Sequence, residues 1–327
     1  MEQPCVRVAR EAGERTRERL SEAGLLDGDH DIVVEDGRLY LPVTDPAAVP
    51  SDLDVVRHEV PARPGQQTPG DLLGWEPTYE RLGDIVILDE DDAERARAAA
   101  EAVMDSDVPA KTVVNRASKV QGDYRVREWE VLAGDGTETV HREYGFEYLV
   151  DIAEVYFSPR LATDRNLVAE QVRADEFAVD MFAGVGPFAI PFAAAGAEVI
   201  AVDLNPAAVR YCRENARRND VADRVTVVGG DVRDVADEYA DSADRLVMNL
   251  PHSADEFLDA AVTLAGDDCT IHYYDIQNED DPFGPGRRAV AAAAEPAGYE
   301  VEITDERVVR SYAPHELNVR LDVRLTR

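Results

Sequence analysis

Lysine is nearly absent from this chain of 327 residues: Lys111 and Lys119 are the two lysines, and arginine supplies the other basic side chains. Acidic residues outnumber basic ones by 67 to 34, which gives a formal net charge of −33 at pH 7. A surface so rich in carboxylates repels itself, and this repulsion is tolerable where screening is short, about 3 Å at molar ionic strength. The charge therefore indicates the salt-rich cytoplasm of a halophilic cell. The charge does not exclude a nucleic-acid partner, because a local patch of basic side chains can bind nucleic acid even on a protein that is acidic overall.

Cysteine and long apolar runs are also scarce. The three cysteines lie far apart, without the spacing of a disulfide framework or a zinc site: Cys5, Cys212 and Cys269. The longest apolar run, residues 181–197, is interrupted by glycine and proline and flanked by acidic residues, and Met1 precedes charged residues rather than an apolar segment. We therefore expect a cytoplasmic protein with no metal site and no membrane span.

The pattern of apolar residues predicts three domains. Residues 1–65 combine a charged helical stretch, 6–26, with short strands, and the Pro/Gly/Gln-rich segment 60–70 is typical of a linker. Residues 71–150 predict strands around at least one alanine-rich helix, an α+β domain. Residues 151–327 form the third domain, in which the pattern changes to alternating strands and helices.

This third part predicts a parallel sheet. Short apolar strands alternate with helical segments that begin near Pro187, Pro206 and Ser253, and the strands read "EFAVD", "AEVIAVD", "RVTVVG", "RLVMN" and "CTIHYYD". Such alternation is typical of βαβ units. The last two runs, 299–310 and 317–325, have no helix between them and predict an antiparallel pair at the edge. The expected fold is therefore α/β, a Rossmann-like and mostly parallel sheet preceded by two small α+β domains.

A glycine turn follows the first of these strands. The strand ends at Asp180 and leads into "GVGPFA", residues 184–189, which matches the dinucleotide pattern G-x-G-x-x-A. Glycines let the backbone approach a ligand, and Asp203, at the end of the next strand, can accept both hydroxyl groups of a ribose. Nicotinamide enzymes and S-adenosylmethionine enzymes both need that acid, so the glycine turn alone does not distinguish between these two classes of enzyme.

Side chains at the ends of the neighbouring strands separate the two. Asp180 can face the cation-bearing amino acid part of S-adenosylmethionine, whereas a pyrophosphate has no use for an anion there. Asp231 closes the third strand, where it can accept the adenine amino group, and Asn249 closes the fourth in "NLP". Each Asp taken singly is equally typical of a helix cap or turn. Together the four strand ends, where open sheets bind ligands, favour a methyltransferase.

These motifs resemble those of the archaeal and eukaryotic tRNA (guanine-N1-)-methyltransferases, which modify the guanosine immediately 3′ of the anticodon. The resemblance covers the whole chain and is carried by "GDYRVREWEVLAG", "VYFSPRLATDR", "VDMFAGVGPFAIPFA", "VDLNP" and "NLP". It implies a class I methyltransferase domain behind a small N-terminal module that checks the outer corner of tRNA and a middle α+β domain. S-adenosylmethionine is the implied cofactor, tRNA is the implied partner, and we expect a monomer.

The resemblance also implies roles for single residues. The family has a glutamate that takes the guanine N1 proton where this chain has Asp164, whose side chain is one methylene shorter. Arg125 resembles the arginine that stabilises O6, with Arg127 as an alternative, and Asn249 with Pro251 is expected at the guanine edge. Tyr156 and Phe157 are expected either to wall the cofactor pocket or to lie in the core. The expected cofactor site comprises Tyr156, Phe157, Asp180, Phe182, Gly184, Gly186, Asp203, Leu204, Asp231, Val232 and Asn249.

Local positive charge is the expected means of RNA contact. Two stretches concentrate the scarce cations: Lys111, Arg116, Lys119, Arg125 and Arg127 in the first, and Arg210, Arg213, Arg217 and Arg218 in the second. The alternative is that these side chains are solvated faces. To expose N1, the guanine must leave the anticodon stack, so a flipped or splayed nucleotide is expected.

Other functions remain open at this point. An aminocarboxypropyl transferase of wyosine synthesis uses the same cofactor and tRNA position, and a dual role on guanosine and a wyosine intermediate is a further alternative. A non-catalytic RNA-binding module that retains a cofactor fold belongs to a different class. The complete set of strand-end residues argues against that module.

The acidic excess leads to a testable expectation. The unfolding temperature should rise as potassium chloride is raised from 0.1 M to 2 M, because screening relieves the repulsion among carboxylates. Thermal melting followed by circular dichroism measures it. A melting temperature and a methylation activity that do not depend on salt would contradict the salt-adaptation account.

Overall fold

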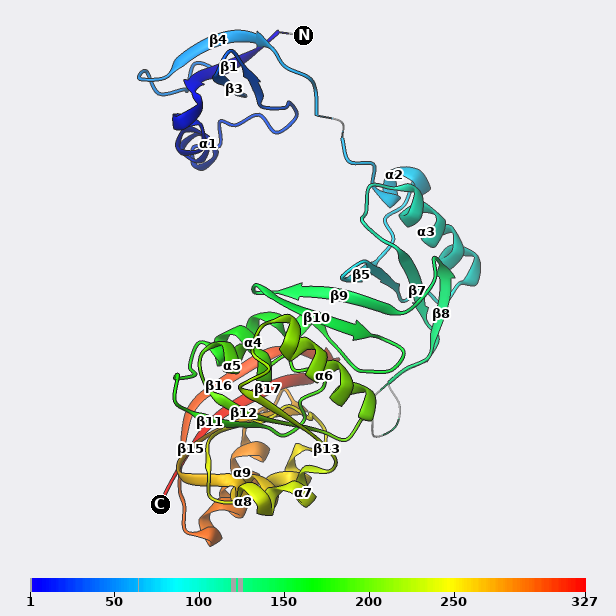
Figure 1. The fold of residues 1–327 in the computed structure, drawn as a ribbon. Coiled ribbons are helices and arrows are strands. Elements are labelled where there is room, and N and C mark those ends of the chain that lie inside the picture. Colours follow the sequence, from blue (N-terminus) through cyan, green and yellow to red (C-terminus); the bar gives the residue numbers. More distant parts are fainter. Residues whose placement is uncertain (1, 64, 119–121, 123–125) are drawn as a thin grey trace. The chain divides into compact units, whose positions relative to one another are not determined.

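The computed structural model describes residues 2–63, 65–118, 122 and 126–327. The chain divides into two compact units, Met1–Leu72 and Leu73–Arg327 (Figure 1). Arg125 and Lys119 therefore lie outside the described residues. No helix of the described part is long and apolar enough to cross a membrane.

The first unit is a four-stranded sheet with one helix. Its strand order is β2-β3-β1-β4, and its elements are β1 (Glu2–Ala9), η1 (Arg10–Ala12), α1 (Gly13–Glu22), β2 (Val33–Glu35), β3 (Arg38–Pro42) and β4 (Asp54–Glu59). The prediction of a helix from residue 6 is wrong for its first residues, because Val6 and Val8 are buried in alternation with Arg7 and pair with β3. Leu20 of α1 and Leu41 complete this small core.

The segment predicted as a linker is shorter than 60–70. Val60 is 2% exposed, and Pro69 and Gly70 belong to the short helix α2 (Pro69–Leu73). The boundaries of the three predicted domains stay a prediction.

The second unit begins with a sheet of order β5-β6-β7-β8. Its elements are β5 (Tyr79–Leu82), β6 (Ile85–Leu88), α3 (Ala93–Asp105), β7 (Thr112–Arg116) and β8 (Trp129–Ala133). The alanine-rich helix is confirmed, and it begins where it does because the Asp92 side chain accepts hydrogen bonds from the backbone amides of Glu94 and Arg95. Its alanine face packs on Val86 and Val113 of the sheet.

A β-hairpin, β9 (Glu138–Glu143) and β10 (Phe146–Asp151), packs on helix α6 (Pro206–Arg218). Two asparagine side chains, one within that helix and one at its end, bind the backbone of β10. Asn215 is fully buried, accepts from the amide of Leu149 at 2.7 Å, and donates to the carbonyls of Leu149 and Val185 at 3.1 and 3.0 Å. Asn219 bonds Glu147 in the same way.

The large sheet has seven strands in the order β13-β12-β11-β14-β15-β17-β16. Its strands are β11 (Phe177–Asp180), β12 (Glu198–Asp203), β13 (Val225–Gly229), β14 (Ala243–Met248), β15 (Ala265–Asn278), β16 (Glu300–Ala313) and β17 (Glu316–Thr326). The first five are parallel to one another, whereas β17 is antiparallel to both β15 and β16. The predicted parallel sheet with an antiparallel edge is therefore confirmed.

Helices cover both faces of this sheet (Figure 1). Besides α6, the helices of this part are η2 (Pro159–Leu161), α4 (Ala162–Ala169), α5 (Ala189–Ala194), α7 (Val232–Val235), η3 (Ala236–Tyr239), η4 (Ala254–Phe257), α8 (Leu258–Leu264), α9 (Gly284–Ala294) and η5 (Glu295–Ala297). In β12, Val199 and Ala201 face the core that contains α5 and α6, while Ile200 and Val202 face the core that contains α8 and α9. This alternation buries the strand on both sides. Helix α9 was not predicted from the sequence.

We predict that Asn215→Ala lowers the free energy of unfolding by about 2–4 kcal/mol, because buried backbone groups of Leu149 and Val185 lose their partner. Asn166→Ala is the matched control, since it removes an exposed hydrogen bond to Glu170 and should change stability by less than about 0.5 kcal/mol. Urea unfolding of both variants measures the difference. Equal stabilities would contradict the docking role of Asn215.

Candidate functional site: a cavity at the carboxyl ends of the parallel strands

A cavity of about 820 Å³ lies at the carboxyl ends of β11 to β14. Most of the predicted site residues line it: Tyr156, Phe157, Phe182, Gly184, Asp203, Leu204, Asp231, Val232, Asn249 and Pro251. Asp180, Gly186 and Asp164 are not among its lining residues. Gly184 and Gly186 have φ values of +54° and +93°, and a Cβ on Gly186 would lie 3.0 Å from Sγ of Cys212. The turn thus requires glycine for its backbone and for its packing.

Asp203 is fixed at the cavity wall by two backbone amides. Gly184 N donates to Oδ2 at 2.7 Å and Asn205 N donates to Oδ1 at 2.8 Å. Asn205 also caps α6, because its side chain accepts from Ala207 N next to Pro206. Burial raises the pKa of Asp203. The strand, turn and cap therefore hold one carboxylate where the ribose hydroxyls of a nucleoside are expected.

Asp180 lies beneath the glycine turn and is 1% exposed. Its Oδ1 accepts from Phe182 N at 3.4 Å, while its Oδ2 accepts no hydrogen bond from any residue that the structure describes. Burial raises the pKa of this carboxyl to about 7. A buried carboxyl oxygen without a partner, at the base of a glycine turn, fits the ammonium-bearing end of S-adenosylmethionine.

Asp231 caps a helix and also lines the cavity. Its side chain caps α7 by accepting from Arg233 N at 2.9 Å, and Nη2 of Arg233 donates to it at 2.5 Å. The hydrogen bond from Arg233 lowers the pKa of Asp231. The same residue lines the cavity, so it remains available to an adenine amino group.

Aromatic side chains form the walls on either side. Phe182 meets Phe257 edge to face, with ring centroids 4.9 Å apart. Tyr156 is 43% exposed, whereas Phe157 is partly buried against the core, with its ring centroid 5.1 Å from the guanidinium of Arg165. The sequence left open whether these two residues line the pocket or lie in the core. Tyr156 lines the cavity, while Phe157 lines the cavity and also packs against the core.

The loop after β14 presents Asn249 to the cavity. Among the described residues nothing donates to its buried Oδ1. Leu250 and Pro251 line the cavity beside it, and His252, at φ +87°, meets the ring of Tyr312 edge to face at 5.2 Å. The Asn-Leu-Pro sequence therefore ends the strand and also places an amide oxygen in the site.

Asp164 is held by partners that were not predicted from the sequence. Its two arginine neighbours in the sequence bind other acids: Arg165 forms a bidentate pair with Glu143, and Arg160 pairs with Glu80. The partners of Asp164 are instead Arg320 Nη1, which donates to Oδ1 at 2.5 Å, and the Tyr274 hydroxyl, which donates to Oδ2 at 2.6 Å. Arg165 follows Asp164 directly in α4, and adjacent residues of a helix point in different directions. Arg160 is four residues before Asp164 but lies in η2 and binds Glu80 of β5 instead.

The Asp164 pair is one end of a buried polar row across the sheet. Arg320 also donates to Asp322 at 2.8 Å, and Nδ1 of His272 donates to Asp322 at 2.7 Å. Nε2 of His272 accepts from Arg245, which is paired with Glu176 at 2.6 Å. Burial lowers the pKa of His272. This row was not predicted from the sequence, although the polar residues that alternate with apolar ones in "LNVRLDVRL" are a signal of it.

Of the two arginines expected to stabilise O6, the structure describes Arg127. Arg125 lies outside the described residues. Arg127 is half-buried and lies 5.3 Å from the ring centroid of Trp129, and burial lowers its pKa, with the charge of Arg116 adding to the effect. Arg127 does not belong to the described lining of the cavity.

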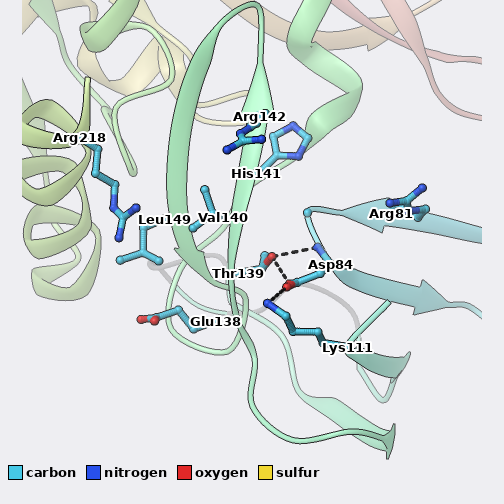
Figure 2. Close-up of a pocket in the computed structure, with 11 residues that line it drawn as sticks. Arg81, Asp84, Lys111, Glu138, Thr139, Val140, His141, Arg142, Leu149 and Arg218 are labelled. Carbon is cyan, nitrogen blue, oxygen red and sulfur yellow. Dashed lines mark hydrogen bonds and ion pairs between the residues drawn. The ribbon is translucent and has the colours of Figure 1, made fainter. Parts of the chain in front are cut away.

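Several cations of the two basic stretches are paired with acids where the structure describes them. Lys111 pairs with Asp84 and Arg116 with Glu80 and Asp89, while Arg210 pairs with Glu154. A second cavity has a volume of about 810 Å³, and Arg142 and Arg218 belong to its lining. Figure 2 shows the ion pair of Lys111 with Asp84 at this cavity. To bind an RNA phosphate, each of these paired side chains would first have to give up its ion pair with an acid. Within the described residues no group of His, Cys, Asp and Glu side chains could hold a metal ion.

The mixed sheet, the glycine turn and the acids at the strand ends define a class I methyltransferase that uses S-adenosylmethionine. A family model of the TRM5/TYW2 methyltransferase domain matches residues 139–302, one of the tRNA methyltransferase 5 N-terminal domain matches residues 5–51, and one of the TYW2 N-terminal domain matches residues 68–137. The chain belongs to the TRM5/TYW2 methyltransferase family.

Relatives of known activity match the chain over different lengths. The tRNA (guanine(37)-N(1))-methyltransferase Trm5b of Pyrococcus abyssi is 37% identical, covering 98% of this chain and 99% of its own. A tRNA(Phe) (4-demethylwyosine(37)-C(7)) aminocarboxypropyltransferase of Pyrococcus horikoshii is 33% identical, covering 80% of this chain and 94% of its own. Among solved structures, a complex of aTrm5 with tRNALeu matches with a TM-score of 0.70 and 32% identity, covering 98% of this chain and 99% of that one. TYW2 of Methanocaldococcus jannaschii in complex with AdoMet matches with a TM-score of 0.62 and 28% identity, covering 76% and 100%.

We predict that the affinity for S-adenosylmethionine rises about tenfold between pH 6 and pH 8. Asp180 must lose its proton to face an ammonium group, and its pKa of about 7 places this loss within the interval. Above pH 8 the affinity should level off. Isothermal titration calorimetry measures it, with Asp180→Asn as the control that binds more weakly and loses the pH dependence. A flat profile for the parental protein would remove Asp180 from the cofactor site.

Proposed function

We propose that this chain is a tRNA (guanine(37)-N1)-methyltransferase, which transfers a methyl group from S-adenosylmethionine to N1 of the guanosine 3′ of the anticodon. The observation that carries the proposal is the extent of the similarity: the match to Trm5b includes the first unit, Met1–Leu72, and spans 98% of this chain, against 80% for the aminocarboxypropyl transferase. The similarity to a solved complex of aTrm5 with tRNALeu supports tRNA as the partner.

The cofactor supplies an electrophilic methyl group on a sulfonium. Guanine N1 carries a proton and is a poor nucleophile, so the protein must accept that proton and stabilise the negative charge that develops at O6. We assign the proton to Asp164 and the charge to an arginine, Arg125 or Arg127. Asn249 and Pro251 orient the guanine edge at the end of β14.

The position of Asp164 sets a condition on this assignment. Its neighbours Leu161 and Arg165 line the cavity, while Asp164 itself is 6% exposed and is bonded to Arg320 and Tyr274. Each carboxylate oxygen can accept a second hydrogen bond, so the capacity to take a proton remains. The guanine must leave the anticodon stack and enter the cavity to reach this wall.

Features of the whole protein complete the proposal. The three predicted domains bind tRNA together, the first at the outer corner and the second and third around the anticodon. The protein acts as a monomer in a salt-rich cytoplasm, where the excess of 67 acidic over 34 basic residues keeps it soluble.

Aminocarboxypropyl transfer is the second candidate, and the presence of such relatives in the same family favours it as the alternative. That reaction attacks from a ring carbon, which loses its own proton as the new bond to carbon forms, so it needs a different activation from that of the guanine N1. The test is transfer to unmodified tRNA transcripts that carry guanosine or adenosine at position 37, followed by mass spectrometry of the nucleosides. We expect 1-methylguanosine from the first transcript and no product from the second. An aminocarboxypropyl product, or none at all, would contradict the proposal.

We predict that Asp164→Asn lowers the single-turnover rate of methylation by a factor of about 10² to 10⁴, because the amide keeps the shape but cannot accept the proton. The affinities for tRNA and cofactor should change little. Rapid-quench measurements with labelled cofactor give the rate.

Asp164→Glu is the control for this change, since the family uses the longer carboxylate, and it should keep much of the activity. Arg320 loses an ionic partner in the Asn variant, so its thermal stability is measured alongside. A parental methylation rate in Asp164→Asn would show that the carboxylate is a structural partner of Arg320 and that the base lies elsewhere.

A further inference from the structure

The antiparallel edge of the sheet contributes a row of side chains to the cavity. Ile276 of β15 lies opposite Asn318 of β17, and Asn318 lies opposite Arg310 of β16. Directly opposite residues of antiparallel strands project from the same face. All three line the cavity that contains Asp203 and Asn249. The edge strands therefore form part of the site as well as the end of the sheet.

Asn318 is the buried member of this row. It is 2% exposed, and its Oδ1 accepts no hydrogen bond from any described residue. Buried amide oxygens are rarely left without a donor in native proteins, and a ligand is one of the partners that satisfies them. Asn249 presents a second such oxygen to the same cavity.

The neighbours of Asn318 connect it to the rest of the site. Along β17, Asn318 and Arg320 are two residues apart and so share a face, and Arg320 binds Asp164. On the other side, Arg310 lies 5.6 Å from the ring centroid of Tyr312, which in turn meets His252 of the loop after β14. Asn318 thus lies on the same strand face as Arg320, which binds the candidate base, and opposite Arg310, whose neighbour Tyr312 contacts the loop that carries Asn249 and Pro251.

The chemistry of the guanine edge matches this arrangement. Guanine presents the N1 proton and the two protons of its 2-amino group side by side, whereas adenine presents an unprotonated N1 and has no amino group at C2. A carboxylate and two amide oxygens are acceptors for such a row of donors. We infer that Asn318 determines specificity for guanine by accepting a hydrogen bond from the 2-amino group. This inference rests on the proposed function.

The test compares tRNA transcripts with guanosine or inosine at position 37, because the two bases differ in the 2-amino group alone. The parental protein should prefer guanosine. In Asn318→Ala, kcat/KM for the guanosine transcript should fall about tenfold and kcat/KM for the inosine transcript less than about twofold, since inosine has no 2-amino group to donate to Asn318. The preference for guanosine then disappears.

Two further variants control for folding and for position. Asn318→Asp keeps an acceptor oxygen in place and should retain the preference for guanosine. Asn278→Ala removes an exposed asparagine of β15 that does not belong to the described lining, and it should leave both values of kcat/KM unchanged.

The outcomes separate the inference from the proposed function. Equal losses on guanosine and inosine in Asn318→Ala, or loss of the preference in Asn318→Asp, would overturn the inference while leaving methylation at guanosine 37 intact. If the parental protein methylates neither transcript, the proposed function itself fails and the inference fails with it.

Discussion

The buried guanidinium of Arg320 is the group on which the arrangement of the site depends. It is 1% exposed and donates to Asp164 of α4 and to Asp322 of its own strand. A buried cation is tolerated where its donors are paired, and removal of one partner of a buried pair costs about 3–5 kcal/mol. The helix that carries the candidate base is thereby fixed to the antiparallel edge of the sheet, and Asp322 remains as a second buried partner of the same guanidinium.

The same constraint links the two halves of the cavity. The parallel strands supply the two carboxylates proposed for the cofactor, Asp203, held by backbone amides, and Asp180, buried at the end of β11. The antiparallel strands supply Arg320 and the face that carries Asn318. Because both sets belong to one continuous sheet, the distance between the cofactor side and the base side is set by the spacing of strands rather than by flexible loops.

Local patterns in the sequence predicted most of the catalytic fold, while the partners of its charged side chains could not be predicted. The alternation of strands and helices, the helix that begins at Pro206 and the glycine turn depend on residues close in sequence, and they are confirmed. The contact between Asp164 and Arg320 joins residues 156 positions apart, and no local pattern encodes it. The start of the chain was predicted as helix because its charges dominate the composition, whereas pairing with β3 and β4 decides in favour of a strand.

Nucleoside mass spectrometry of tRNA from a strain that lacks this chain tests the central claim most directly. The account predicts that 1-methylguanosine at position 37 disappears and returns when the parental gene is restored. If 1-methylguanosine persists and a wyosine intermediate without its aminocarboxypropyl group accumulates instead, the chain transfers a different part of the cofactor and the account is contradicted.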